Sequence, residues 1–144
     1  MKQLATVANE TGTFDTIIHN AGIGYAQPFK KTEDGVSMVF AVNSLAPYVL
    51  TALMNRPKRL VFTSSGLHSG GDGTLKDMGG SGAPGTADQG ADTLAWLASG
   101  NGAGSGQLYK SRKVVKPHKA AQDVKKQEEF LGICEQLSGV KFPK

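Results

Sequence analysis

The hydrophobic and polar positions of this chain alternate between short apolar runs and longer stripes of helical spacing. Residues 14–20 form an apolar, β-branched run that stops at a Gly-containing turn, and residues 59–65 form a second run that ends in small polar residues. Each run predicts a buried parallel strand. Between them, over residues 32–54, apolar side chains return every three to four positions, and Pro47 predicts a kink in this long helix. Strand, helix and strand in this order predict a βαβ unit.

Further elements are predicted on either side of this unit. Residues 2–11, 86–98 and 120–137 have the apolar spacing of helices. Residues 99–106 are a Gly/Ser/Asn linker, and residues 107–115 are a candidate third strand of the same sheet. Because the predicted strands lie between helix-covered faces, four mid-strand residues are expected to be the most buried: Ile17, Ile18, Val61 and Phe62.

The composition is that of one globular domain. The 144 residues are 39% apolar and 19% charged, enough for a single hydrophobic core. The single cysteine, Cys134, excludes an internal disulfide framework and fits a reducing compartment. No apolar run approaches the roughly 20 residues of a membrane span. The first ten residues lack the apolar stretch of a signal peptide, so we expect a cytoplasmic protein without a membrane span.

Charge and histidine placement argue against two other kinds of site. Seven of the sixteen Lys and Arg residues fall between Lys110 and Lys126. A nucleic-acid surface would interleave aromatic rings with the charge, so we interpret this cluster as a solvated face and expect no nucleic-acid partner. His68 and His118 have no Cys or acidic residue at ligand spacing, so we expect no metal site.

Three short motifs occur in order within the predicted βαβ unit. They are His-Asn-Ala-Gly at residues 19–22, Phe-Ala-Val-Asn at residues 40–43 and Val-Phe-Thr-Ser-Ser at residues 61–65. Together, at the spacing of one βαβ unit, they resemble the short-chain dehydrogenase/reductase superfamily, although His19 stands where that family more often has Asn. The segments at residues 78–84 and 116–118 are similar to the tail of retinol-dehydrogenase-like and fungal members. The resemblance implies a single truncated Rossmann-like α/β domain over residues 1–144, with a central block (1–77) and a C-terminal block (78–144).

The resemblance also implies a chemistry and its residues. The cofactor would be NAD or NADP, and the substrate a small-molecule carbonyl or alcohol that exchanges a hydride with it. Asn20, Ala21 and Gly22 would lie beside the adenosine half of the cofactor, where small residues let the backbone approach closely. Asn43 would hold a water of the family's proton relay, and Ser65 would hydrogen-bond the substrate oxygen. Without the resemblance, Asn43 could equally tie the helix to the strand, and the serine pair could simply cap a strand end.

The chain departs from the family pattern in two places. The 19 residues before Asn20 are too few to present the Gly-rich loop that binds the cofactor pyrophosphate, so we expect no tight cofactor binding. Lys76 and Asp77 lead through Met78 directly into Gly79, where relatives carry the helix with the catalytic Tyr and Lys. This indicates an internal join near Met78.

Two segments resemble functional patterns only superficially. Tyr109 and Lys113 fit Tyr-x-x-x-Lys, but their surroundings favour a strand over the helix that the chemistry needs, and we expect Tyr109 to lie far from Ser65. Residues 100–106 fail Gly-x-Gly-x-x-Gly in every register. We therefore predict an oxidoreductase of this superfamily that is impaired as it stands. The alternative is a non-catalytic remnant or partner-binding fragment, and exposure of the helix over residues 32–54 would favour a homo-oligomer.

Overall fold

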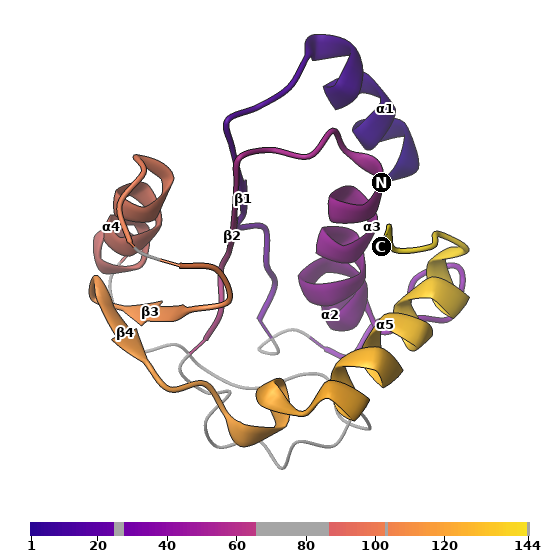
Figure 1. The fold of residues 1–144 in the computed structure, drawn as a ribbon. Helices are drawn as coiled ribbons and strands as arrows, with labels where there is room; N and C mark the ends of the chain where they lie inside the picture. The colour runs from indigo at the N-terminus through magenta and orange to yellow at the C-terminus, as the bar shows by residue number, and fades with distance from the viewer. Residues whose placement is uncertain (25–27, 66–86, 103, 144) are drawn as a thin grey trace.

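The computed structural model describes residues 1–24, 28–65, 87–102 and 104–143 (Figure 1). The expected join near Met78, the predicted helix start at Thr86 and the loop histidine His68 lie outside these residues. In chain order the elements are α1 (Lys2–Thr11), β1 (Thr16–His19), α2 (Met38–Phe40), a π-helical turn (Ala41–Leu45), α3 (Ala46–Leu53), β2 (Arg59–Phe62), α4 (Ala87–Ala98), β3 (Leu108–Lys110), β4 (Lys113–Val115), a 3₁₀ turn (Lys119–Gln122) and α5 (Val124–Ser138).

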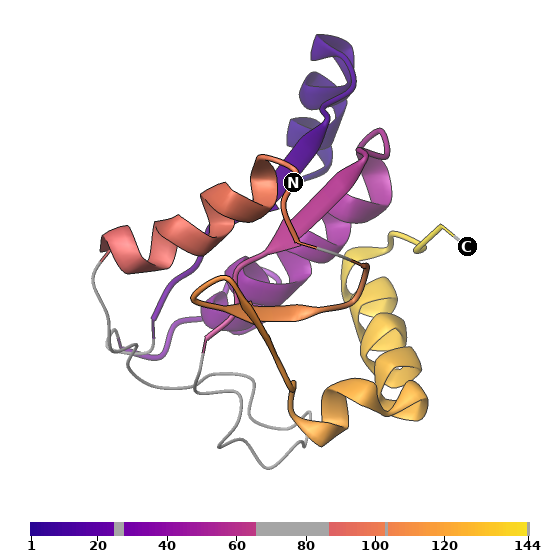
Figure 2. The ribbon, with the colours of Figure 1, turned by 60° about the vertical axis from the view of Figure 1, so that its left-hand side comes forward.

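The strands β1 and β2 form the predicted parallel pair. Their register places Thr16 opposite Arg59 and His19 opposite Phe62. α3 covers one face of this two-stranded sheet and α4 covers the other (Figures 1 and 2). On the α4 side, the Thr16 hydroxyl donates to the carbonyl of Ala98 at 3.3 Å. The fold is therefore a partial Rossmann-like α/β arrangement, as expected, and both strands end at the same edge of the sheet.

Residues 107–115 do not join this sheet, so the expectation of a third parallel strand is wrong. β3 and β4 instead form a separate antiparallel pair. They are joined by a two-residue turn in which Ser111 and Arg112 have φ values of 49° and 61°, the backbone geometry of a tight hairpin. A connection this short can join only antiparallel strands, because parallel pairing needs a long crossover.

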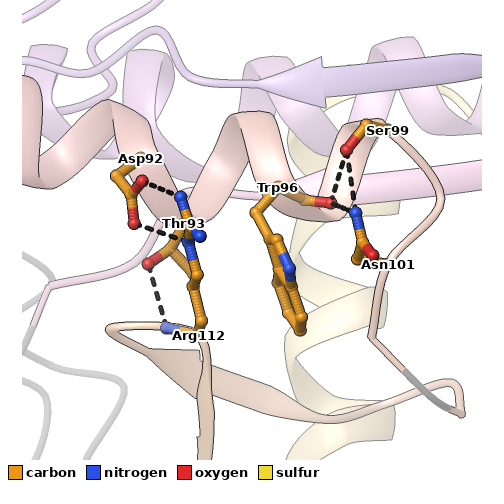
Figure 3. Close-up of polar contacts among 6 residues, drawn as sticks. All are labelled: Asp92, Thr93, Trp96, Ser99, Asn101 and Arg112. Atoms are coloured by element: carbon orange, nitrogen blue, oxygen red, sulfur yellow. Dashed lines mark hydrogen bonds and ion pairs between the residues drawn. The ribbon is translucent and has the colours of Figure 1, made fainter.

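The hairpin is attached to α4 at two points, and Figure 3 shows the one at its turn. At its turn, the backbone N–H of Arg112 donates to Thr93 Oγ1 at 3.3 Å, and the guanidinium Nε donates to the Asp92 carboxylate at 2.9 Å. Further along, the ring of Tyr109 packs edge-to-face on Trp96, with centroids 5.9 Å apart. Helix α4 therefore carries the hairpin on the side away from the sheet strands.

The loop between α4 and β3 is held by specific hydrogen bonds. The Ser99 hydroxyl and the Asn101 side-chain amide both donate to the carbonyl of Trp96, at 3.0 and 3.1 Å, which satisfies an open acceptor at the end of α4 (Figure 3). From the start of β2, the Arg59 guanidinium donates to the carbonyls of Gly100 and Asn101 at 3.2 and 2.8 Å. The loop is thus tied both to its helix and to the sheet.

The helix predicted over residues 32–54 begins later than expected and is interrupted. Thr32 closes a turn before it, because its hydroxyl oxygen accepts from the backbone N–H of Val36 at 3.1 Å, and helical structure starts only at Met38. After α2 the chain passes through the π-helical turn into α3, whose first turn contains Pro47. Proline has no N–H to donate within a helix but fits the start of one. The helix is not broken at Pro47: its irregular part is the π-helical turn just before the proline, and the kink itself stays a prediction.

The hydrophobic core lies between α2–α3 and α5, beside the sheet rather than on it (Figure 1). Its buried members are Phe40, Tyr48, Val49, Cys134 and Val140. The rings of Phe40 and Phe130 meet edge-to-face with centroids 6.4 Å apart, and the Tyr48 hydroxyl donates to the carbonyl of Val140 at 2.8 Å. Cys134 is fully buried, and burial raises the pKa of its thiol to about 11, so the thiol stays protonated at neutral pH.

Helix α5 starts at Val124 rather than at the predicted residue 120. A carboxylate oxygen of Asp123 accepts from the backbone N–H of Lys125 at 2.9 Å, which caps the first turn. Residues 119–122 form the separate 3₁₀ turn. At the other end Gly139 has φ 63°, the left-handed conformation that commonly closes a helix.

The strand residues are less buried than the sequence predicts. Of the four expected to be most buried, Val61 is buried at 6% exposure and Ile17 is half-buried, whereas Ile18 and Phe62 are 40% and 52% exposed. The expectation is wrong for Ile17, Ile18 and Phe62, because only Val61 of the four is buried. A two-stranded sheet has no inner strand, so each strand is also an edge, and one helix per face covers only part of each side chain.

Candidate active site

The two motif turns meet where the parallel strands end. β1 leads into Asn20, and β2 leads into Thr63 and then Ser65. The Thr63 hydroxyl donates to the side-chain oxygen of Asn20 at 2.9 Å, and the Thr63 N–H donates to the carbonyl of His19 at 3.0 Å. In parallel α/β sheets, ligands bind outside the carboxyl ends of the strands. The predicted site residues of both strands therefore lie at the edge where a ligand is expected.

Asn43 joins this edge from the helical side. Its side-chain oxygen accepts from the backbone N–H of Ile23 at 2.8 Å, and its side-chain nitrogen donates to the carbonyl of the same residue at 2.9 Å. This two-point contact fixes the turn of residues 20–22 against the helix. This contact ties the helix to the end of β1, as the structural interpretation of Asn43 predicts. It does so at the predicted site, so it is also compatible with the interpretation as a site residue.

The π-helical turn explains how Asn43 reaches that turn. Such turns widen a helix locally and are frequent at functional sites. Here the turn spans Ala41–Leu45 with Asn43 at its middle, directly before α3. Because Pro47 lacks an N–H, it cannot donate the ordinary helical hydrogen bond to the carbonyl of Asn43. The side chain of Asn43 is thus engaged with Ile23.

Exposure and electrostatics differ between the turn and the strand beneath it. Asn20, Ala21, Gly22, Asn43 and Ser65 are all exposed. By contrast, His19 is half-buried, and burial lowers the pKa of its imidazole below the ordinary value because it disfavours the charged form. The half-buried, neutral imidazole of His19 therefore lies next to the exposed polar residues at the ends of β1 and β2.

The Tyr-x-x-x-Lys match lies on the hairpin. Tyr109 belongs to β3 and Lys113 to β4, on opposite sides of the turn, and Lys113 lies opposite Lys110. The predicted strand character of this segment is confirmed. Its two residues do not share a helical face, and the ring of Tyr109 packs on Trp96. That Tyr109 is far from Ser65 stays a prediction.

The described residues contain no group of three or more His, Cys, Asp or Glu side chains that could hold a metal ion. No helix in the described part of the chain has the length and apolar character to cross a membrane.

The contacts of His19 were not predicted from the sequence. Its ring stacks on Phe62, and its Nε2 lies 3.1 Å from the Thr51 hydroxyl of α3. No local pattern links Thr51 to a residue so far before it. The sequence predicted that Asn43 could tie the helix to the strand, but it did not predict that the partner is the backbone of Ile23.

Two relatives that align with almost the whole chain show which family it belongs to. An uncharacterized oxidoreductase of Emericella nidulans is 38% identical over an alignment that includes 99% of this chain and 75% of the relative. The short-chain dehydrogenase chry4 of Gibberella zeae is 31% identical over the same shares. The chain belongs to the short-chain dehydrogenase/reductase superfamily. No family model matches this short-chain dehydrogenase/reductase chain.

Two other similarities are narrower. Retinol dehydrogenase 14 of Homo sapiens is 40% identical to this short-chain dehydrogenase/reductase chain over 75 residues, which cover 48% of the chain and 22% of that relative. A crystal structure of an uncharacterized protein from Mycobacterium paratuberculosis superimposes with a TM-score of 0.77 at 22% identity, covering 98% of this chain and 73% of that one. The second likeness shows a shared fold.

The alignment with the Emericella relative also contains gaps. It spans 191 positions, whereas this short-chain dehydrogenase/reductase chain has 144 residues, so at least 47 positions (191 − 144) are gaps in this chain. The relative therefore has residues within the aligned range that this chain lacks. An internal join such as the one expected near Met78 produces gaps of this kind.

Proposed function

We propose that the C-terminal ends of β1 and β2 form part of the active site of a nicotinamide-dependent oxidoreductase. This enzyme acts on a small carbonyl or alcohol. The observation that carries the proposal is the convergence of the three motifs at one edge. Thr63 bonds Asn20 across the strand ends, and Asn43 holds the turn that follows Asn20 through Ile23. This convergence of residues far apart in the sequence supports the assignment of one shared site to them.

The turn after β1 fits a flat, closely approaching cofactor. Ala21 and Gly22 are exposed and small, and a Cβ built on Gly22 would have Asn43 Oδ1 as its neighbour at 3.6 Å, an ordinary contact. A larger side chain beyond that Cβ would cover the backbone that a ligand must reach. We assign Asn20, Ala21 and Gly22 to cofactor contact. NAD or NADP, when bound, supplies or accepts the hydride.

Ser65 and Asn43 have separate proposed roles. We assign Ser65, which lies beyond the end of β2 and is exposed, to a hydrogen bond with a substrate oxygen. Asn43 uses its side chain on Ile23. Its backbone carbonyl, opposite Pro47, is the acceptor that we assign to a water in the path of the transferred proton.

We further propose that the 144-residue polypeptide turns over weakly or not at all. General acid catalysis needs a donor within hydrogen-bond reach of the substrate oxygen, with its pKa tuned by a neighbour. The Tyr109 and Lys113 pair is displayed on a hairpin attached to α4 rather than on a helix beside Ser65. The Emericella relative has at least 47 more aligned positions (191 − 144), room for a helix that carries such a pair.

A second candidate function is that of a non-catalytic remnant that binds a partner. The observation in its favour is an apolar stripe on α1. Met1, Leu4 and Val7, spaced three apart on one helical face, are 56%, 51% and 53% exposed. An exposed stripe of this kind is typical of an interaction surface, including one between two copies of the chain. A partner-binding remnant of this kind does not need to bind nucleotide at the C-terminal ends of β1 and β2.

Titration of the isotope-labelled chain with NADH and NADPH tests the proposal. We expect no saturable binding at micromolar concentration by calorimetry, but weak, fast-exchange shifts of the Gly22, Ile23 and Ser65 amide signals at millimolar nucleotide. The Asn43→Leu variant, which loses both contacts with Ile23, should lose these shifts. Asn55→Leu, which changes another exposed asparagine, should keep them. Shifts confined to other parts of the chain, or none at all, would favour the non-catalytic candidate.

A further inference from the structure

We propose that His19 is a positioning residue that sets the separation of the two strand ends in the site. The inference rests on the proposed function. His19 is the last residue of β1, directly before Asn20, and lies opposite Phe62, the last residue of β2. A change at this pair is therefore transmitted through the backbone to the cofactor side at Asn20 and to the substrate side at Ser65.

Three elements meet at the His19 ring. The imidazole stacks on the Phe62 ring, with centroids 4.8 Å apart and an interplanar angle of 22°. Its Nε2 lies 3.1 Å from the Thr51 hydroxyl oxygen on α3. In addition, the carbonyl of His19 accepts from the N–H of Thr63 at 3.0 Å. One residue thus joins β1, β2 and the helix that also carries the Asn43 turn.

This cluster is better protected than the other link between the strand ends. The hydrogen bond from Thr63 to Asn20 joins two exposed side chains, where water competes for both partners. The ring of His19 is half-buried, and burial keeps its pKa low and the ring neutral at pH 7. Phe62 is 52% exposed, so the stack on His19, rather than burial, holds its ring in place.

The contact set depends on histidine. Asparagine, the residue that the family more often has at this position, carries no ring to stack on Phe62. Phenylalanine would stack but could not hydrogen-bond Thr51, and glutamine would offer an amide near the position of Nε2 without a stacking ring. These alternatives separate the two contacts experimentally. Phenylalanine at position 19 removes the hydrogen bond and keeps a stacking ring, whereas glutamine removes the stacking ring and keeps a hydrogen-bonding group.

The test uses amide spectra of the full 144-residue chain and four variants. We expect His19→Phe and Thr51→Val, which remove the same hydrogen bond from opposite sides, to shift the signals of Asn20 and Ser65 in the same direction. His19→Gln should retain the hydrogen-bond effect and alter mainly signals near the lost stack. Thr6→Val is the matched control, because Thr6 is likewise a helix threonine with a hydrogen-bonded hydroxyl, but it lies on α1 and donates to the carbonyl of Lys2. It should leave the strand-end signals unchanged.

A merely structural His19 would give a different outcome. If His19→Phe and Thr51→Val lower the melting temperature while the Asn20 and Ser65 signals stay in place, the positioning role is wrong. If His19→Phe fails to fold, Thr51→Val alone decides, together with the imidazole ¹⁵N signals of His19, which should change when its hydrogen-bond partner is removed. These spectra need no nucleotide, so they stand apart from the NADPH titration. Absence of NADPH shifts in the parent chain would overturn the proposed function and leave the His19 linkage measurable.

Discussion

Gly102 stands where two side chains leave no room for a third. It has φ +79°, and a Cβ built on it would lie 2.8 Å from Leu97 Cδ2 and 3.1 Å from the Tyr109 hydroxyl oxygen. Gly104, two residues on, has φ +80°, but its built Cβ would meet only Gln107, at 3.7 Å and beyond. The two glycines therefore share a backbone requirement, and only one of them also has a steric requirement.

This pair allows the two costs to be separated. Gly104→Ala should destabilise the chain by about 1 kcal/mol, the penalty for an L-residue in left-handed backbone. Gly102→Ala should cost clearly more, because Leu97 or Tyr109 must also move. Urea unfolding of the two variants side by side measures the difference. Equal midpoints would mean that the ring of Tyr109 shifts without cost.

His19 should carry a pH dependence of defined sign. Burial lowers its pKa in the folded state below the ordinary 6.5, so the unfolded chain binds the proton at a higher pH than the folded chain does. Stability from this residue is therefore complete above about pH 6.5 and is lost as the pH falls toward the folded pKa. Between about pH 7.5 and 5.5 the urea midpoint of the parent should fall more than that of His19→Gln. Parallel curves for the two proteins would contradict the assignment.

At the scale of elements, the hairpin β3–β4 shows how far local patterns reach. Its strand character was predictable from residues 107–115, but its partner was not. The pairing depends on Ser111 and Arg112 adopting positive φ, which neither residue favours on its own, and on the hydrogen bonds from Arg112 to α4. A turn without Asn or Gly gives no hairpin signal. The sequence therefore predicted a strand and assigned it to the wrong sheet.

The same turn offers a stabilising change. Asparagine tolerates left-handed backbone better than serine does, and it is favoured at the first position of such turns. Ser111→Asn should therefore stabilise the hairpin by roughly 0.5 kcal/mol, and Ser111→Val should destabilise it by about 1 kcal/mol or more. Hydrogen exchange of the β3 and β4 amides should slow in the first variant and quicken in the second. A result of the same sign for both would show that the turn does not limit hairpin opening.

At the scale of the whole molecule, the core and the candidate site lie in different places. The site is at the end of the two strands, whereas the core joins α2–α3 to α5. The strands and the helical spacing could be predicted because each depends on nearby residues. The position of the core could not, because Tyr48 and Val140 meet across 92 residues. Neither could the contact of His19 with Thr51, for the same physical reason.

Two phenylalanines test where stability resides. Phe40 is 4% exposed and packs on Phe130, so Phe40→Ala should cost about 3–5 kcal/mol. That is a large part of the stability of a domain this size, typically about 5–15 kcal/mol. Phe62→Ala, the matched control on the sheet, should cost about 1 kcal/mol, because the side chain is 52% exposed. Urea unfolding measures both, and a larger loss for Phe62 would place the core on the sheet after all.

The hydrogen bond from Tyr48 to Val140 has a consequence for chain length. The residues between its two ends form one large loop, closed by the core, and the entropy of closing a loop grows only with the logarithm of its length. Adding 47 residues (191 − 144), the least that the alignment gaps represent, to the 92-residue separation would raise the closure cost by only about 0.4 kcal/mol. The stability of the packing between α3 and α5 therefore hardly depends on whether those residues are present. Splice forms or homologues that differ by an insertion in this loop should share the same helical core, while differing in what the carboxyl edge of the sheet can do.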